Sequence, residues 1–72
     1  MARVLITAAG GDIGIGAIQS LQKASHETIA VDMNPHGAGL YIADHGVCVP
    51  AASDNEWPTA MTRVVKEYNV DI

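Results

Sequence analysis

The sequence has no phenylalanine, a single cysteine, and only four lysine and arginine residues among 72. One cysteine, Cys48, cannot form an internal disulfide, which excludes the disulfide-stapled class of small secreted domains. The eight acidic residues give a formal net charge of −4, so the chain lacks the basic patch that attracts nucleic acid or an anionic membrane surface. We therefore expect no nucleic-acid partner and no membrane partner.

Long hydrophobic runs are also missing. The apolar run at residues 4–6 is followed by Thr7 and is too short for a signal-peptide core or a membrane span, so we expect a cytoplasmic protein. An apolar content of 49% nevertheless excludes a disordered chain. A chain of this size forms one domain at most and buries only about 60% of its unfolded surface, which predicts marginal stability.

Three segments are typical of strands that are buried on both faces of a parallel sheet, namely residues 3–7, 28–31 and 46–50. Helical patterns at residues 13–24 and after Trp57 separate or follow them. This alternation predicts an α/β fold of three layers, with a parallel sheet in the order 3-2-1 that forms part of a Rossmann-like fold.

The helical patterns also predict which side chains face the sheet. In the first helix these are Ile13, Ala17, Ile18, Leu21 and Ala24, and in the last helix Trp57, Ala60, Met61, Val64, Val65 and Tyr68. We expect Asn55 to cap the last helix, because Pro58 then falls in its first turn. Residues 40–43 are expected to form one helical turn, and Cys48 to be a small buried hydrophobe in the third strand.

A glycine-rich turn at residues 8–14 is the one motif that carries chemistry. A strand, a glycine-rich turn and a helix N-terminus together form a potential anion site, because free backbone N–H groups point outward there. In dinucleotide-binding folds an acidic residue follows about 20 residues later. Five residues are therefore the candidate ligand-facing set: Gly10, Gly11, Asp12, Gly14 and Asp32.

The dinucleotide fingerprint is incomplete, because alanine stands at its first glycine position in either spacing, at Ala8 or Ala9. The Asp12 carboxylate would also repel a pyrophosphate. The glycines can equally form a tight turn that only lets the helix pack on the strand. Asp12 is expected as the helix N-cap or a first-turn acid. Asp32 is either a solvated strand-end acid or a hydrogen-bond acceptor for a hydroxyl group.

No other pattern predicts a catalytic or metal site. The spacing of His36, Asp44, His45 and Cys48 matches no zinc pattern, so we expect no metal site. No Ser-His-Asp set or pair of catalytic carboxylates can be argued from spacing. No lysine follows the glycine-rich turn, which excludes a nucleoside-triphosphate P-loop.

The whole chain resembles the opening of ATP-grasp ligases related to the carbamoyl-phosphate synthase large subunit. The similar segments are residues 4–14, Ile29-Ala30-Val31-Asp32 with Asn34-Pro35, Ala38-Gly39-Leu40-Tyr41 with Ala43-Asp44, Val49-Pro50 with Ala52-Ser53-Asp54, and residues 68–72. The resemblance implies an N-terminal pre-ATP-grasp domain that helps to line the cleft for the acceptor substrate. In that family ATP and magnesium activate a carboxylate as an acyl phosphate, which an amine or a similar nucleophile then attacks.

The resemblance also implies that later domains hold ATP and magnesium, so this chain alone should bind no cofactor and should not catalyse ligation. Its partners would be the remaining ATP-grasp domains, in cis or in trans. Residues 70–72 look like the start of a fourth strand, so we expect a single domain over residues 1–72, truncated there. An open edge on the first strand would then favour a homo-oligomer.

Two other functions stay open at this point. The chain could be the truncated NAD(P)-binding domain of an extended short-chain dehydrogenase, or a stand-alone interaction module without a ligand.

Overall fold

The β-branched segments form one parallel sheet in the computed structural model, which describes all 72 residues. The strands are β1 (Arg3–Ile6), β2 (Glu27–Asp32) and β3 (His45–Cys48), with β2 in the middle. Both pairs of neighbouring strands are parallel, and Ile6 lies opposite Ala30. The predicted strand order and direction are confirmed.

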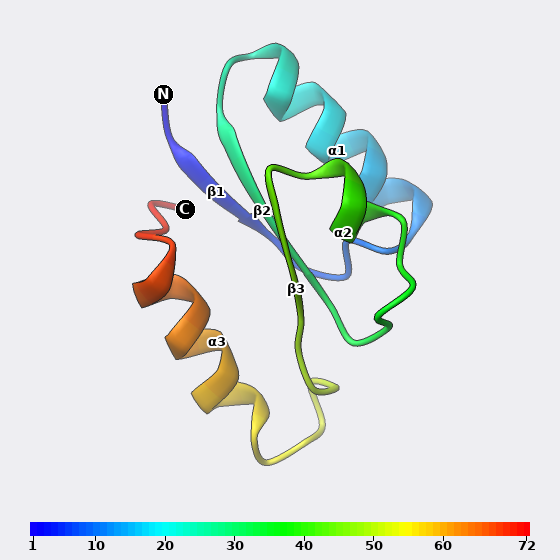
Figure 1. Ribbon diagram of the computed structural model, residues 1–72, viewed down its shortest axis with the longest axis vertical. Helices are drawn as coiled ribbons and strands as arrows, with labels where there is room; N and C mark the ends of the chain where they lie inside the picture. The colour runs from blue at the N-terminus through cyan, green and yellow to red at the C-terminus, as the bar shows by residue number, and fades with distance from the viewer.

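Helices cover both faces of the sheet, so the predicted three layers are confirmed. Figure 1 shows α1 (Asp12–Lys23) and the short α2 (Gly39–Ile42) on one face and α3 (Trp57–Glu67) on the other. The core on the α1 face is formed by Ala9, Ile18 and Ala30, and the core on the α3 face by Ile29, Val31, Val49 and Val64. Neither layer contains a helix long and apolar enough to cross a membrane.

The central strand β2 carries side chains into both cores, because successive residues of a strand point to opposite faces. Ile29 and Val31 pack under α3, whereas Ala30 packs under α1. Thr28 is also fully buried, and its hydroxyl oxygen accepts a hydrogen bond from the backbone N–H of Asp44. These buried residues explain why the continuous apolar pattern of β2 predicted a strand covered on both sides.

The predicted inner face of α1 is partly wrong. Ile13 is 90% exposed, and Ala17 and Ala24 are exposed as well. The buried positions are Gly14 and Ile18. Gly14 is on the inner side because α1 lies so close to the preceding loop that no larger residue fits there. With Gly14 on the inner side, the neighbouring Ile13 lies on the outer side of the helix.

The start of α3 also differs from the prediction. The helix begins at Trp57, and the residue before it is Glu56 rather than the expected cap Asn55. No side chain caps the helix, and the carboxylate of Asp54 accepts the N–H of Glu56 at 2.8 Å, just before the first turn. Pro58 does lie in the first turn, as predicted, and Trp57 packs against the core under α3.

Cys48 is exposed, so the prediction that it is a buried hydrophobe is wrong. Its neighbours Val47 and Val49 point into the core under α3, which turns Cys48 to the other face. That face of β3 is covered only at Gly46, where the backbone of Leu40 in α2 lies against the strand. The periodicity of β3 is therefore that of an edge strand with one covered face.

The edge of β1 opposite β2 is partly paired with the end of the chain. Asp71 donates its backbone N–H to the carbonyl of Arg3 at 2.8 Å, and Leu5 donates to the carbonyl of Ile72 at 2.8 Å. The side chain of Asp71 also accepts the N–H of Arg3 at 2.8 Å. Residues 70–72 thus lie where a fourth strand was predicted, although they form no regular strand. Self-association through the rest of this edge stays a prediction.

Both long helices end in the same hydrogen-bonded motif. In α1 the N–H of Ser25 bonds the carbonyl of Gln22 and the N–H of His26 bonds that of Leu21. The corresponding residue after α3 is Asn69, and both Ser25 and Asn69 have a left-handed backbone, with φ of 66° and 52°. Glycine is the residue most often found at this position.

We predict that Ser25→Gly raises the free energy of unfolding by about 0.5–1 kcal/mol. The left-handed backbone costs serine about 1–2 kcal/mol, and glycine avoids this cost. The greater flexibility of glycine in the unfolded chain offsets part of the stabilisation. Asn69→Gly is the matched control with a smaller effect, because asparagine tolerates this conformation. Urea unfolding of the three proteins measures the difference, and equal stabilisation by both variants would contradict it.

Candidate functional site

The glycine-rich loop and the end of β2 meet at the carboxyl ends of the parallel strands. Residues 7–11 follow β1, and Asp32 is the last residue of β2. The loop is tied to the sheet by the N–H of Ala9, which bonds the carbonyl of Val31 at 3.1 Å. This is the edge at which open α/β sheets bind their ligands.

The loop begins with a left-handed residue. Ala8 has a φ of 51°, a backbone conformation that glycine adopts without strain and alanine adopts at a cost of about 1–2 kcal/mol. Ala8 stands at the position where one form of the dinucleotide fingerprint has its first glycine. The tight turn that this glycine would form is therefore present, although the glycine is not.

Gly14 serves packing rather than ligand contact. A Cβ atom on Gly14 would lie 2.7 Å from the Cα of Ala9 and 3.0 Å from the carbonyl oxygen of Ala8, which is closer than real atoms approach. The backbone of Gly39, at the start of α2, also packs closely against Ala9, because a Cβ atom on Gly39 would overlap the carbonyl group of Ala9. Gly14 thus matches the packing alternative of the sequence analysis.

The carboxylate of Asp32 lies between two glycines. A Cβ atom on Gly10 would meet Oδ2 of Asp32, and one on Gly37 would lie 2.8 Å from the same oxygen. Asp32 is half-buried, and its carboxylate accepts no hydrogen bond from the chain. The structure therefore brings Asp32 and Gly10 together, as expected, and Gly37 is a third member that sequence reasoning missed.

Gly11 and Asp12 lie at the exposed start of α1. Gly11 is the residue before the helix, and no side chain caps the first turn. Asp12 is the first helical residue, which confirms its prediction as a first-turn acid. The backbone N–H groups of this turn are the donors that the site can offer, while the carboxylate of Asp32 is the acceptor.

An apolar cleft of about 440 Å³ opens at the same end of the sheet, on the face covered by α3. Its lining comes from the end of β2, from the segments that follow the three strands and from the start of α3: Thr7, Ala8, Val31, Asp32, Met33, Val49, Pro50, Ala51, Ala52 and Trp57. The sequence analysis did not predict this cleft, although most of its lining lies at or just after the ends of predicted strands.

Asp32 borders this cleft, but its carboxylate is directed toward the other face of the sheet. Val31 faces α3 and the cleft, so the side chain of the next residue, Asp32, points to the α1 face, in agreement with its contact at Gly10. The site can thus offer a polar half, with backbone donors and one carboxylate, and an apolar half.

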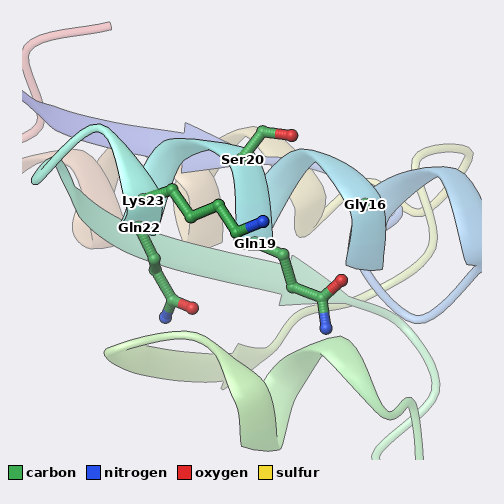
Figure 2. Close-up of a pocket in the computed structure, with 5 residues that line it drawn as sticks. All are labelled: Gly16, Gln19, Ser20, Gln22 and Lys23. Carbon is green, nitrogen blue, oxygen red and sulfur yellow. The ribbon is translucent and has the colours of Figure 1, made fainter.

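A second hollow lies along the outer flank of α1 and does not belong to this edge. Figure 2 shows its lining residues Gly16, Gln19, Ser20, Gln22 and Lys23, with Gln22 directed toward α2. The amide nitrogen of Gln22 donates to the carbonyl of Ile42 at 3.0 Å. The side chain of Gln22 therefore links α1 to α2.

Few charged side chains lie around the glycine-rich loop. No group of three or more histidine, cysteine or acidic side chains lies close enough together to hold a metal. The glycine-rich loop carries no lysine or arginine, and its one charged side chain is the acidic Asp12.

Residues 4–72 match the model of one protein family, described as PylC-like, N-terminal domain. Neither the curated proteins nor the solved structures gave a match.

We predict opposite effects for alanine at two glycines of α1. Gly14→Ala lowers the free energy of unfolding by about 1–3 kcal/mol, because its Cβ meets the backbone of Ala9. Gly16→Ala, the matched control, raises it by about 1 kcal/mol, since its Cβ meets nothing within 4 Å and alanine favours the helix. Thermal and urea unfolding test both, and two changes of the same sign would contradict the packing role of Gly14.

Proposed function

Because the chain belongs to the family of PylC-like N-terminal domains, the pre-grasp domain of ATP-grasp ligases, we propose that it is the substrate-side domain of a cytoplasmic carboxylate–amine ligase. The carboxyl edge of its sheet lines the cleft in which the acceptor substrate binds. The observation that carries the proposal is the family match over residues 4–72, together with the carboxylate of Asp32 beside Gly10.

ATP and Mg²⁺ are assigned in this proposal to the remaining ligase domains, in cis or in trans. Those domains would convert a carboxylate and ATP into an acyl phosphate and ADP, and attack by an amine would then release phosphate. The carboxylate of Asp12 at the start of α1 supports this division, because a phosphate group is repelled by a carboxylate. The chain alone would not catalyse ligation.

The finer part of the proposal is a kinship with the carbamoyl-phosphate synthase large subunit. It is supported by the similarity of residues 29–44, which supply Asp32 and Gly37 beside the glycine-rich loop. In this reading the contact between Asp32, Gly10 and Gly37 holds the loop at a fixed position over the acceptor.

We predict that Asp32→Asn in the whole ligase raises the KM for the acceptor substrate about tenfold or more and leaves the KM for ATP unchanged. The reason is that a hydrogen bond to a charged group contributes about 1.5–3 kcal/mol to binding. The matched control is Glu67→Gln, which removes an exposed carboxylate from the far end of α3. Steady-state kinetics, followed by ADP release, measure both KM values. Equal changes in the KM for the acceptor and the KM for ATP would contradict the prediction.

A dinucleotide site is the second candidate, and one observation favours it. The carboxylate at the end of β2 lies beside the glycine-rich loop, which is where such folds bind a ribose hydroxyl. The acidic Asp12 at the helix start opposes it, because a like charge near the surface costs on the order of 1–4 kcal/mol.

We predict that NAD and NADP bind the chain with a dissociation constant above about 10 μM, roughly −7 kcal/mol of binding free energy. Calorimetric titration measures it, and Asp12→Asn serves as the companion variant that removes the repulsion. A dissociation constant below about 10 μM for the unmodified chain would favour the dehydrogenase interpretation.

A further inference from the structure

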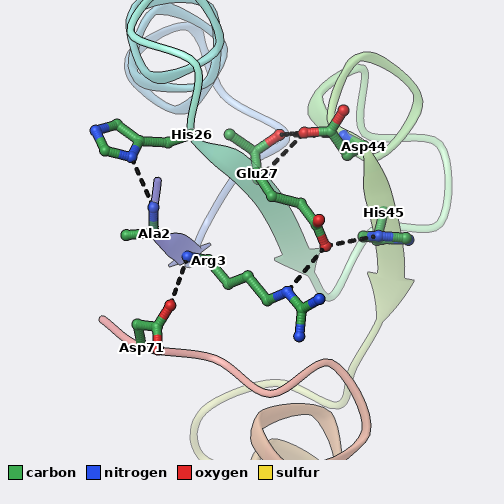
Figure 3. A network of polar contacts seen from close by, with 8 residues as sticks. Ala2, Arg3, His26, Glu27, Asp44, His45 and Asp71 are labelled. Carbon is green, nitrogen blue, oxygen red and sulfur yellow. Dashed lines mark hydrogen bonds and ion pairs between the residues drawn. The ribbon is translucent and has the colours of Figure 1, made fainter.

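The amino end of the sheet, opposite the candidate site, is held by side chains that the proposed function does not use. Figure 3 shows hydrogen bonds and ion pairs there that join β1 to the start of β2 and to the end of the chain, and β2 to β3. Two histidines take part in this network, His26 and His45. Their positions make the attachment of β1 sensitive to protons.

His26 can hold β1 only as a neutral ring. The backbone N–H of Ala2 donates to Nδ1 of His26 at 3.0 Å. Because a backbone N–H can only donate, Nδ1 must carry a lone pair and the ring proton must be on Nε2. A second proton would turn Nδ1 into a donor that faces another donor, so protonation and this hydrogen bond exclude each other.

This hydrogen bond matters because Ala2 and Arg3, at the start of β1, are also bonded to the start of β2 and to the end of the chain. The carbonyl of Ala2 accepts the N–H of Glu27 at 3.0 Å, while the backbone of Arg3 holds Asp71 through its N–H and its carbonyl. Release of Ala2 therefore loosens the start of β1 and, with it, the attachment of residues 71–72.

The second histidine shares a carboxylate with Arg3. Oε2 of Glu27 lies 3.6 Å from Nε of Arg3 and 3.1 Å from Nε2 of His45, so one oxygen contacts both partners. The ring of His45 is held in place by Tyr68, with ring centroids 4.9 Å apart.

Charged groups surround His26 from every neighbouring element. The hollow beside its ring is lined by Met1 at the chain start, Glu27 of β2, and Asp44 and His45 between α2 and β3. Glu27 and Asp44 carry negative charge, whereas the amino group of Met1 and a protonated His45 carry positive charge. Whatever the balance of these charges, a proton on Nδ1 removes the hydrogen bond to Ala2.

We propose that His26 is a proton-operated latch. The neutral ring fastens the start of β1 to the turn between α1 and β2, and a proton on Nδ1 releases it. Acidification then loosens the start of β1 and residues 71–72 while the glycine-rich loop at the opposite end keeps its structure.

The test is a titration of ¹⁵N-labelled protein from pH 8 to pH 5 by NMR. We expect the Ala2 amide signal to move with the same midpoint as the His26 ring. Hydrogen-exchange protection of the Leu5 and Asp71 amides, corrected for the intrinsic pH trend, should fall about two- to tenfold, the factor expected for one net hydrogen bond. The Ala9 amide at the other end should keep its protection.

The variant His26→Asn places a non-titrating amide oxygen close to the position of Nδ1 and should abolish the pH dependence. His36→Asn is the matched control, because His36 is exposed and its ring makes no hydrogen bond, and it should behave like the unmodified protein. An unchanged pH dependence in His26→Asn would overturn the latch. If that variant does not fold, the ring nitrogen shifts of the unmodified protein decide, since a proton on Nδ1 at pH 8 would overturn it equally.

Discussion

The close approach of two helices to one alanine organises this domain. Ala9 is fully buried, and both Gly14 of α1 and Gly39 of α2 press their backbones against it. No larger residue fits at either glycine, so the distance between the glycine-rich loop and the helices is fixed by backbone contact alone. The hydrogen bond from Ala9 to Val31 extends this contact to the sheet. The position of the loop relative to β2, and with it the contact between Gly10 and Asp32, depends on this arrangement.

The sheet could be predicted from the sequence because its strands contain short runs of apolar residues, and the run in β2 is the clearest. Such a run occurs where both faces of a parallel strand are covered, as they are for Ile29, Ala30 and Val31. The helix face of α1 could not be predicted in the same way. The spacing of apolar residues placed Ile13 and Ala17 on the inner face. The actual inner face contains Gly14, which has no side chain, because its backbone packs against the loop. Packing of backbone against backbone leaves no hydrophobic signal.

The candidate site was predictable in part for a related reason. The glycine-rich loop and Asp32 follow predicted parallel strands, and the carboxyl ends of such strands share one edge. Gly37 was missed because it lies in a turn between elements, where its role depends on how the chain folds back. The exposure of Cys48 was missed because its strand lies at the edge, with the far face covered only by the short α2. These errors concern tertiary contacts that no local pattern encodes.

Two ends of the same sheet have different physical characters. At the carboxyl edge, glycines bring backbone atoms together and leave a carboxylate without a partner from the chain. At the amino edge, Glu27, Arg3, His45 and Asp71 satisfy one another through side chains. Unsatisfied polar atoms are available for a ligand, whereas mutually satisfied ones hold the strands together. The proposed substrate site and the proposed latch follow from this division.

The left-handed Ala8 has a consequence for how such domains are recognised. A fingerprint written in residue letters requires glycine at this position and rejects the chain, although the backbone makes the turn that the glycine would make. The strain of about 1–2 kcal/mol that alanine tolerates here is small enough for a folded domain to absorb. A left-handed residue at this point of the loop therefore does not require glycine, and a search by backbone torsion angle would find chains that a search by sequence motif rejects.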